Sequence, residues 1–143
     1  MQNSKNYSDR SPTSRKWSAL LWVLQILLAA LYGMSGYMNT FMSPEKLVAM
    51  GMTHAAALPL GMVRFLGIAE LLGVIGLTLP ALTRINPVLT PAAALGFVAL
   101  QMLAMIYHVM HNEFFMLPVN IILLTLATLI LWGRIKKAPI NPR

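Results

Sequence analysis

The sequence predicts an all-α membrane protein, a four-helix transmembrane bundle with both termini in the cytoplasm. The composition, four long apolar segments and the positions of the basic residues lead to this prediction. Of the 143 residues, 57% are hydrophobic and only 10% are charged, whereas soluble domains carry about 25% charged residues. A soluble chain of this length has too little interior to bury so much apolar sequence. A single integral membrane domain is therefore indicated.

Four segments are long and apolar enough to cross a bilayer, which takes about 20 residues of helix. The links after the second and third segments are short, so the helices on either side of each link are expected to run antiparallel. In the longer link at residues 42–59, Ser43 followed by Pro44 is typical of a helix start and predicts a short helix. The predicted spans are residues 17–41, 60–82, 89–111 and 115–132.

The basic residues predict the orientation. Lys and Arg number four before the first span, four after the last and one at Arg84, whereas the opposite loops hold only Lys46. The positive-inside rule therefore places both ends in the cytoplasm. We expect a disordered basic tail at residues 1–16, a membrane domain at 17–134 and a basic tail at 135–143. The expected location is a bacterial inner (plasma) membrane. A cleaved signal peptide is the alternative for the first span, although its apolar stretch is longer than usual for one.

Several classes of function are excluded by the residues present. The net charge of +7 lies at the flanks of the spans, and no basic patch is interleaved with aromatic residues, so no nucleic-acid partner is expected. The absence of cysteine excludes disulfides, thiolate catalysis and iron–sulfur ligation. No Glu-x-x-His motif for a di-iron site is present. We therefore predict no metal site and no catalytic residues, and the lipid bilayer is the expected partner.

The second span carries two opposite charges, Arg64 and Glu70. A charge at the centre of a membrane helix costs about 2.5–3.5 kcal/mol on insertion scales, so it usually has a partner or a function. An ion pair that locks the helices, a ligand, proton or quinone site, and a contact between subunits all remain open. Helical side chains lean toward the N-terminus, so the Glu70 side chain leans toward Arg64. A direct ion pair and a pair joined by a bridging group both remain open.

Polar residues of different spans come to similar depths when the spans are antiparallel. They fall mostly between the midplane and the outer surface, while the inner half is nearly pure Leu, Ile, Val and Ala. This pattern predicts a polar pocket that opens outward and is closed on the inner side by apolar side chains. The candidate ligand-binding residues are Arg64, Glu70, His108, Tyr32, Asn39, Gln101 and Asn120.

The second span and the link after it carry a motif that resembles the DoxX-like family of small four-helix membrane proteins. The resemblance extends over about residues 17–134. The polar and glycine positions that carry it run from Gly36 to Asn120. It implies that Arg64, Glu70, His108 and Asn120 occupy the family's characteristic polar positions, while Asn39 stands where many relatives have Lys. The motif reads Arg64-x-x-Gly67-x-x-Glu70-Leu71-Leu72-Gly73-x-x-Gly76-Leu77-x-Leu79-Pro80, then Leu82-Thr83-Arg84 and Pro87-x-Leu89-Thr90-Pro91-x-Ala93-Ala94.

The resemblance leaves three functions open. Relatives look like membrane subunits of quinone-linked oxidoreductases, resistance factors against oxidants, or assembly factors for membrane proteins. Our first hypothesis is a protein that binds a quinone-like or apolar ligand, or serves as the membrane subunit of a redox complex with a membrane or redox protein partner. A non-catalytic assembly or scaffold protein is the alternative, and a proton-linked transporter that uses Glu70 is the third. Quinone is the one cofactor proposed, and the oligomeric state is left open.

Overall fold

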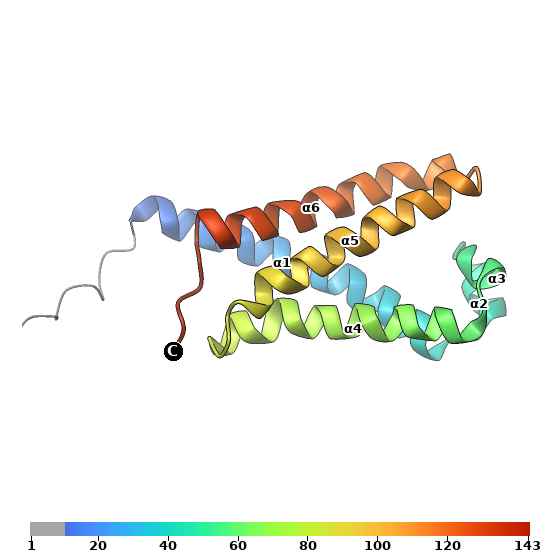
Figure 1. Ribbon diagram of the computed structural model, residues 1–143, viewed down its shortest axis with the longest axis horizontal. Helices are drawn as coiled ribbons and strands as arrows, with labels where there is room; N and C mark the ends of the chain where they lie inside the picture. Colours follow the sequence, from blue (N-terminus) through green and yellow to red (C-terminus); the bar gives the residue numbers. More distant parts are fainter. Residues whose placement is uncertain (1–10) are drawn as a thin grey trace, which may run out of the picture.

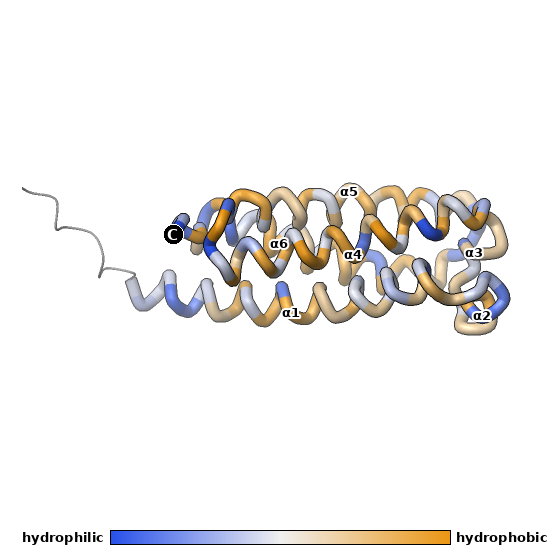
Figure 2. Tube along the Cα trace, turned by 90° about the horizontal axis from the view of Figure 1, so that it is seen from below, coloured by the Kyte–Doolittle hydropathy of each residue, from blue (hydrophilic) through white to orange (hydrophobic). Residues whose placement is uncertain are grey.

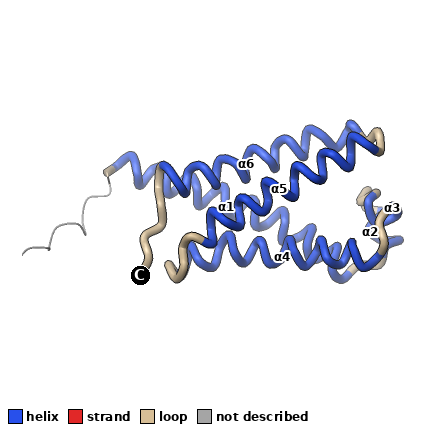
Figure 3. Tube along the Cα trace, viewed as in Figure 1, coloured by secondary structure: helices blue, strands red, loops and turns tan. Residues whose placement is uncertain are grey.

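The computed structural model describes residues 11–143, and this part of the chain is helical without strands (Figures 1 and 3). The prediction of an all-α fold with four membrane-length helices is confirmed. The orientation of the termini relative to the membrane stays a prediction. The elements are α1 (Pro12–Phe41), α2 (Pro44–Ala49), α3 (His54–Ala57), α4 (Leu60–Thr83), α5 (Leu89–Met110), the 3-10 turn η1 (Phe114–Met116) and α6 (Leu117–Lys136).

The helices begin and end close to the predicted span limits, with a difference at each end of the chain. α1 starts at Pro12 rather than at residue 17, so residues 12–16 are helical where a disordered tail was expected. The reason is a local cap: the Ser11 hydroxyl accepts a hydrogen bond from the Ser14 amide at 3.2 Å, and Pro12 suits the first helical position. The rest of the expected tail, residues 1–10, lies outside the described residues. At the other end, α6 continues to Lys136, beyond the predicted limit at 132.

The four long helices lie side by side, with α1 and α5 each packed against both α4 and α6. α5 runs diagonally: it lies beside α4 near the end that holds the start of α1 and the C-terminus, and beside α6 at the opposite end (Figure 1). We call the first of these the terminal end. We call the second the lid end, because α2 and α3 lie there (Figure 1). Apolar residues dominate the lengths of the helices, and hydrophilic ones gather toward the ends (Figure 2).

Glycines allow α1 and α4 to approach each other closely. A Cβ added to Gly67 would lie 2.7 Å from the backbone nitrogen of Thr40 and 2.8 Å from the carbonyl oxygen of Gly36. Neither backbone atom can rotate away, so only glycine fits at this crossing. The close approach brings Glu70, one turn further along α4, against the polar face of α1.

A buried polar contact joins three helices in the terminal half. The Gln25 amide of α1 donates to the carbonyl oxygen of Leu77 in α4 at 2.8 Å. The Arg134 Nε of α6 donates to the oxygen of the same amide at 2.6 Å. Arg134 is only 3% exposed, and its guanidinium also lies over the Trp22 ring. This residue therefore packs inside the fold, whereas its position in the sequence indicated only the orientation of the chain.

The link between α1 and α4 folds over the lid end, and we call residues 43–58 the lid. The predicted start of α2 is confirmed, since the Ser43 hydroxyl accepts from the Lys46 amide at 3.4 Å and Pro44 opens the helix. Leu47 and Ala55 are buried in an apolar cluster with Met38 of α1 and Val63 of α4. The lid is thus held to both helices by packing.

Candidate ligand cavity

A cavity of about 500 Å³ lies between the four long helices, beneath the lid. This volume falls within the roughly 300–1,000 Å³ of typical small-molecule sites. Every long helix and the lid contribute residues to its lining. Most of the lining is apolar, with a few polar side chains at separate positions, as in sites that bind a largely apolar ligand.

Most of the residues proposed from the sequence line this cavity, and one does not. The lining residues from that set are Tyr32, Asn39, Glu70, Gln101, His108 and Asn120. Arg64 lies outside the lining, where its Nη1 donates to the Asn39 carbonyl oxygen at 2.7 Å. Within residues 11–143, Arg64 and Glu70 do not form the ion pair that was weighed from the sequence. Arg64 instead binds the backbone beside the cavity.

The Glu70 carboxylate is held by side chains of α1. Ser35 Oγ donates to its two oxygens at 3.0 and 3.1 Å, and Asn39 Nδ2 donates to Oε2 at 3.2 Å. Glu70 is 8% exposed. Hydrogen bonds from neutral donors thus stabilise the buried group in place of a cation. Ser35 was not among the site residues proposed from the sequence.

The boundary of the cavity toward the terminal end is aromatic. Tyr32 stacks on Phe97 with 4.1 Å between ring centroids, and Phe97 belongs to the apolar cluster of the terminal half. The Tyr32 hydroxyl donates to Gln101 Oε1 at 2.6 Å. A Cβ on Gly73 would clash with the Phe97 ring, so this glycine makes room for it. The stacked rings of Tyr32 and Phe97 therefore bound the cavity on the side where the sequence predicted closure by apolar side chains.

Two amide groups in the lining have unused donors. Gln101 Nε2 and Asn120 Nδ2 are buried, and neither has a hydrogen-bond partner among the described residues. A buried donor left unpaired costs about 1–3 kcal/mol. A ligand that offers acceptor atoms at these positions would recover that free energy.

The lid adds a histidine that sequence reasoning did not assign to the site. His54 Nε2 lies 3.0 Å from Asn39 Oδ1; because the Asn39 amide nitrogen already donates to Glu70, the imidazole donates here. Burial, then the nearby His108, lowers the pKa of His54, while Glu113 opposes the change. His54 lies in a link between spans, so no helical periodicity marked it as a site residue.

Glu113, at the turn between α5 and α6, lies close to the lid. Its carboxylate is 2.7 Å from Nδ1 of His108. The nearby Thr53 and His108 hold the pKa of Glu113 below its ordinary value. Among residues 11–143, no three His, Asp or Glu side chains gather closely enough to hold a metal ion.

Comparison with known proteins identifies a family for this chain. The DoxX-like family matches residues 23–130, which include most of each of the four long helices. No curated protein and no solved structure shows significant similarity to the chain. With four apolar helices long enough to cross a membrane, the chain is in contact with the lipid bilayer; a bacterial membrane stays a prediction. The chain is therefore a multi-pass integral membrane protein of the DoxX-like family.

Proposed function

We propose that this protein binds a quinone-like molecule, a lipid-soluble ring with carbonyl oxygens, in the cavity beneath the lid. The observation that carries the proposal is the pair of unpartnered amide donors, Gln101 Nε2 and Asn120 Nδ2, in a mostly apolar lining. Carbonyl oxygens accept hydrogen bonds from such donors, and the apolar walls suit the rest of the ring.

The carboxylate in the same lining extends the proposal to the reduced ligand. A quinol carries hydroxyl groups, which donate hydrogen bonds, and Glu70 offers carboxylate oxygens that accept them. A cavity with donors on α5 and α6 and an acceptor on α4 has partners for both oxidation states. This arrangement suits the membrane subunit of a redox complex, in which a partner protein exchanges electrons with the bound ligand.

The test is the affinity of the purified protein in detergent for decylubiquinone, in variants that remove the donors one at a time. Gln101→Leu and Asn120→Leu are each expected to weaken binding about two- to tenfold, the loss of one hydrogen bond of about 0.5–1.5 kcal/mol. Thr90→Val is the matched control, because Thr90 Oγ1 is also buried and has no hydrogen-bond partner within residues 11–143, but lies outside the cavity lining.

Two outcomes would contradict the proposal. One is that the unsubstituted protein does not bind decylubiquinone. The other is that Thr90→Val weakens binding as much as the cavity variants do. If the cavity variants change only the melting temperature in detergent, the polar groups serve the fold alone, as a scaffold protein would need.

A further inference from the structure

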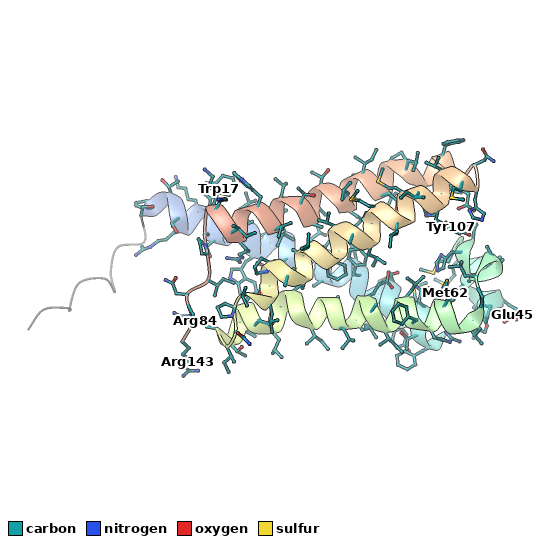
Figure 4. The ribbon with its side chains drawn as sticks, viewed as in Figure 1. Trp17, Glu45, Met62, Arg84, Tyr107 and Arg143 are labelled. Atoms are coloured by element: carbon teal, nitrogen blue, oxygen red, sulfur yellow. The ribbon has the colours of Figure 1, made fainter. Side chains whose placement is uncertain are left out.

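The lining of the cavity includes exposed apolar residues of α4 and α5. Met62 of α4 is 50% exposed and Leu103 of α5 is 64% exposed, although both line the cavity. Met62 and Tyr107 lie on opposite sides of the gap between these helices (Figure 4). We call Met62, Leu66, Leu100 and Leu103 the lateral mouth. These side chains belong to the cavity wall and are wholly apolar.

Residues of the lid line the cavity at the lid end. Met52, His54 and Leu58 of the lid line the cavity. The lid is fixed by its apolar cluster with α1 and α4 and by the hydrogen bond from His54 to Asn39. A ligand that entered between the lid and α1 or α4 would have to displace those contacts.

The course of α5 explains why the mouth lies between these helices. Near the terminal end, Phe97 fills the space beside Gly73, and Ala93 lies close to Gly76, so α4 and α5 are in close contact. Beyond Phe97, α5 moves away from α4 toward α6 (Figure 1). Leu100 and Leu103 follow in this diverging part and face the cavity from the side opposite Met62 and Leu66.

We infer that the ligand reaches the cavity sideways from the bilayer through the lateral mouth, and that an apolar tail of the ligand stays in that mouth while its polar ring binds deeper. The inference rests on the proposed function and specifies the ligand as a ring with a long hydrocarbon tail. Leu31 and Val119, between α1 and α6, also line the cavity at 46% and 53% exposure. Leu103 is the most exposed large apolar residue of the lining, which assigns the route to the α4–α5 side.

A pair of variants separates the tail from the ring. Met62→Trp with Leu103→Trp fills the mouth and is expected to weaken decylubiquinone binding about tenfold, equivalent to about 1.4 kcal/mol. The affinity for the same ring without its tail, 2,3-dimethoxy-5-methyl-1,4-benzoquinone, is expected to change less than about twofold. The matched control is Ile68→Trp with Met102→Trp, on the same helices with 48% and 54% exposure but outside the lining.

A second variant tests the route past the lid. Because the chain has no cysteine, Thr53→Cys with Glu113→Cys introduces a single possible disulfide between the lid and the α5–α6 turn. Loading of decylubiquinone from lipid vesicles is expected to proceed at the same rate in the oxidised and reduced forms of this variant. The reduced form controls for the loss of the two original side chains.

Three results would overturn the inference. They are an unchanged decylubiquinone affinity in the mouth variant, blocked loading in the oxidised lid variant, and a larger loss from Leu31→Trp with Val119→Trp. If the protein binds neither the tailed nor the tail-less quinone, the proposed function itself fails. If it binds both and the mouth variant is harmless, only the sideways route fails.

Discussion

Replacing Gly67 with Ala should force α1 and α4 apart at their closest approach. The new methyl carbon would lie 2.7 Å from the Thr40 nitrogen and 2.8 Å from the Gly36 carbonyl oxygen, whereas ordinary contacts begin at 3.4 Å. Because these obstructing atoms belong to the backbone, the helices themselves must shift by roughly 0.6–0.7 Å. The shift occurs one turn from Glu70, whose bonds to Ser35 and Asn39 are 3.0–3.2 Å long.

The expected loss of stability follows from two opposing effects. Overpacking a close contact costs about 1–3 kcal/mol. Ala is favoured over Gly in a helix interior by about 0.5–1 kcal/mol, which offsets part of that cost. We therefore expect Gly67→Ala to lower the free energy of unfolding by about 1–2 kcal/mol, and to weaken decylubiquinone binding as well.

The assay is reversible unfolding in mixed detergent micelles, together with the quinone affinity. Gly61→Ala in the same helix is the control, because a Cβ on Gly61 would meet nothing within 4 Å. That variant should be neutral or slightly stabilised. Equal unfolding free energies for the two alanine variants would refute the reasoning from close approach.

Three further predictions concern other parts of the chain. Gln25→Met should lower the free energy of unfolding by about 2–3 kcal/mol, because it removes the buried hydrogen-bond partner of the Arg134 cation and of the Leu77 carbonyl oxygen. Chemical denaturation measures this change, and a loss below about 0.5 kcal/mol would contradict the prediction. Glu70→Gln should weaken decylubiquinol binding about tenfold and decylubiquinone binding much less, since only the quinol donates a hydrogen bond to the carboxylate. Equal losses of affinity for the two ligands would count against Glu70 as the acceptor for the quinol. The lid should loosen as the pH falls from 7.5 to 5.5. The lowered pKa of His54 means that the folded lid favours the neutral imidazole, so the lid loses stability as the pH falls below about 6.5. Labelling of Ala55→Cys, divided by labelling of the exposed Gly51→Cys at the same pH, should rise on acidification, and His54→Gln should abolish the rise.

Much of the fold could be predicted because hydropathy and length determine membrane helices directly. The four spans, the antiparallel links and the start of α2 at Ser43 follow from local rules of apolar length and capping. The extension of α1 back to Pro12 depends on a single cap at Ser11, which lies in a polar segment that composition alone assigns to a tail.

The candidate site could be predicted only in part, because depth is easier to infer than the direction in which a side chain points. Gln101 and Asn120 were proposed from the polar residues of the spans, and both line the cavity. Arg64 was proposed in the same way, but its long side chain reaches the Asn39 backbone instead. The burial of Arg134 depends on the three-helix contact at Gln25, which brings together residues 109 positions apart in the sequence.

The diagonal course of α5 has a mechanical consequence. In the terminal half of α5, the Phe97 ring packs against α4 in the space beside Gly73. The lid half of α5 lies beside α6 (Figure 1). A small tilt of α5 about that ring would widen the opening toward the hydrocarbon layer. Phe97 would then act as the pivot, and its size would govern how readily a bulky lipid-soluble molecule passes between bilayer and interior.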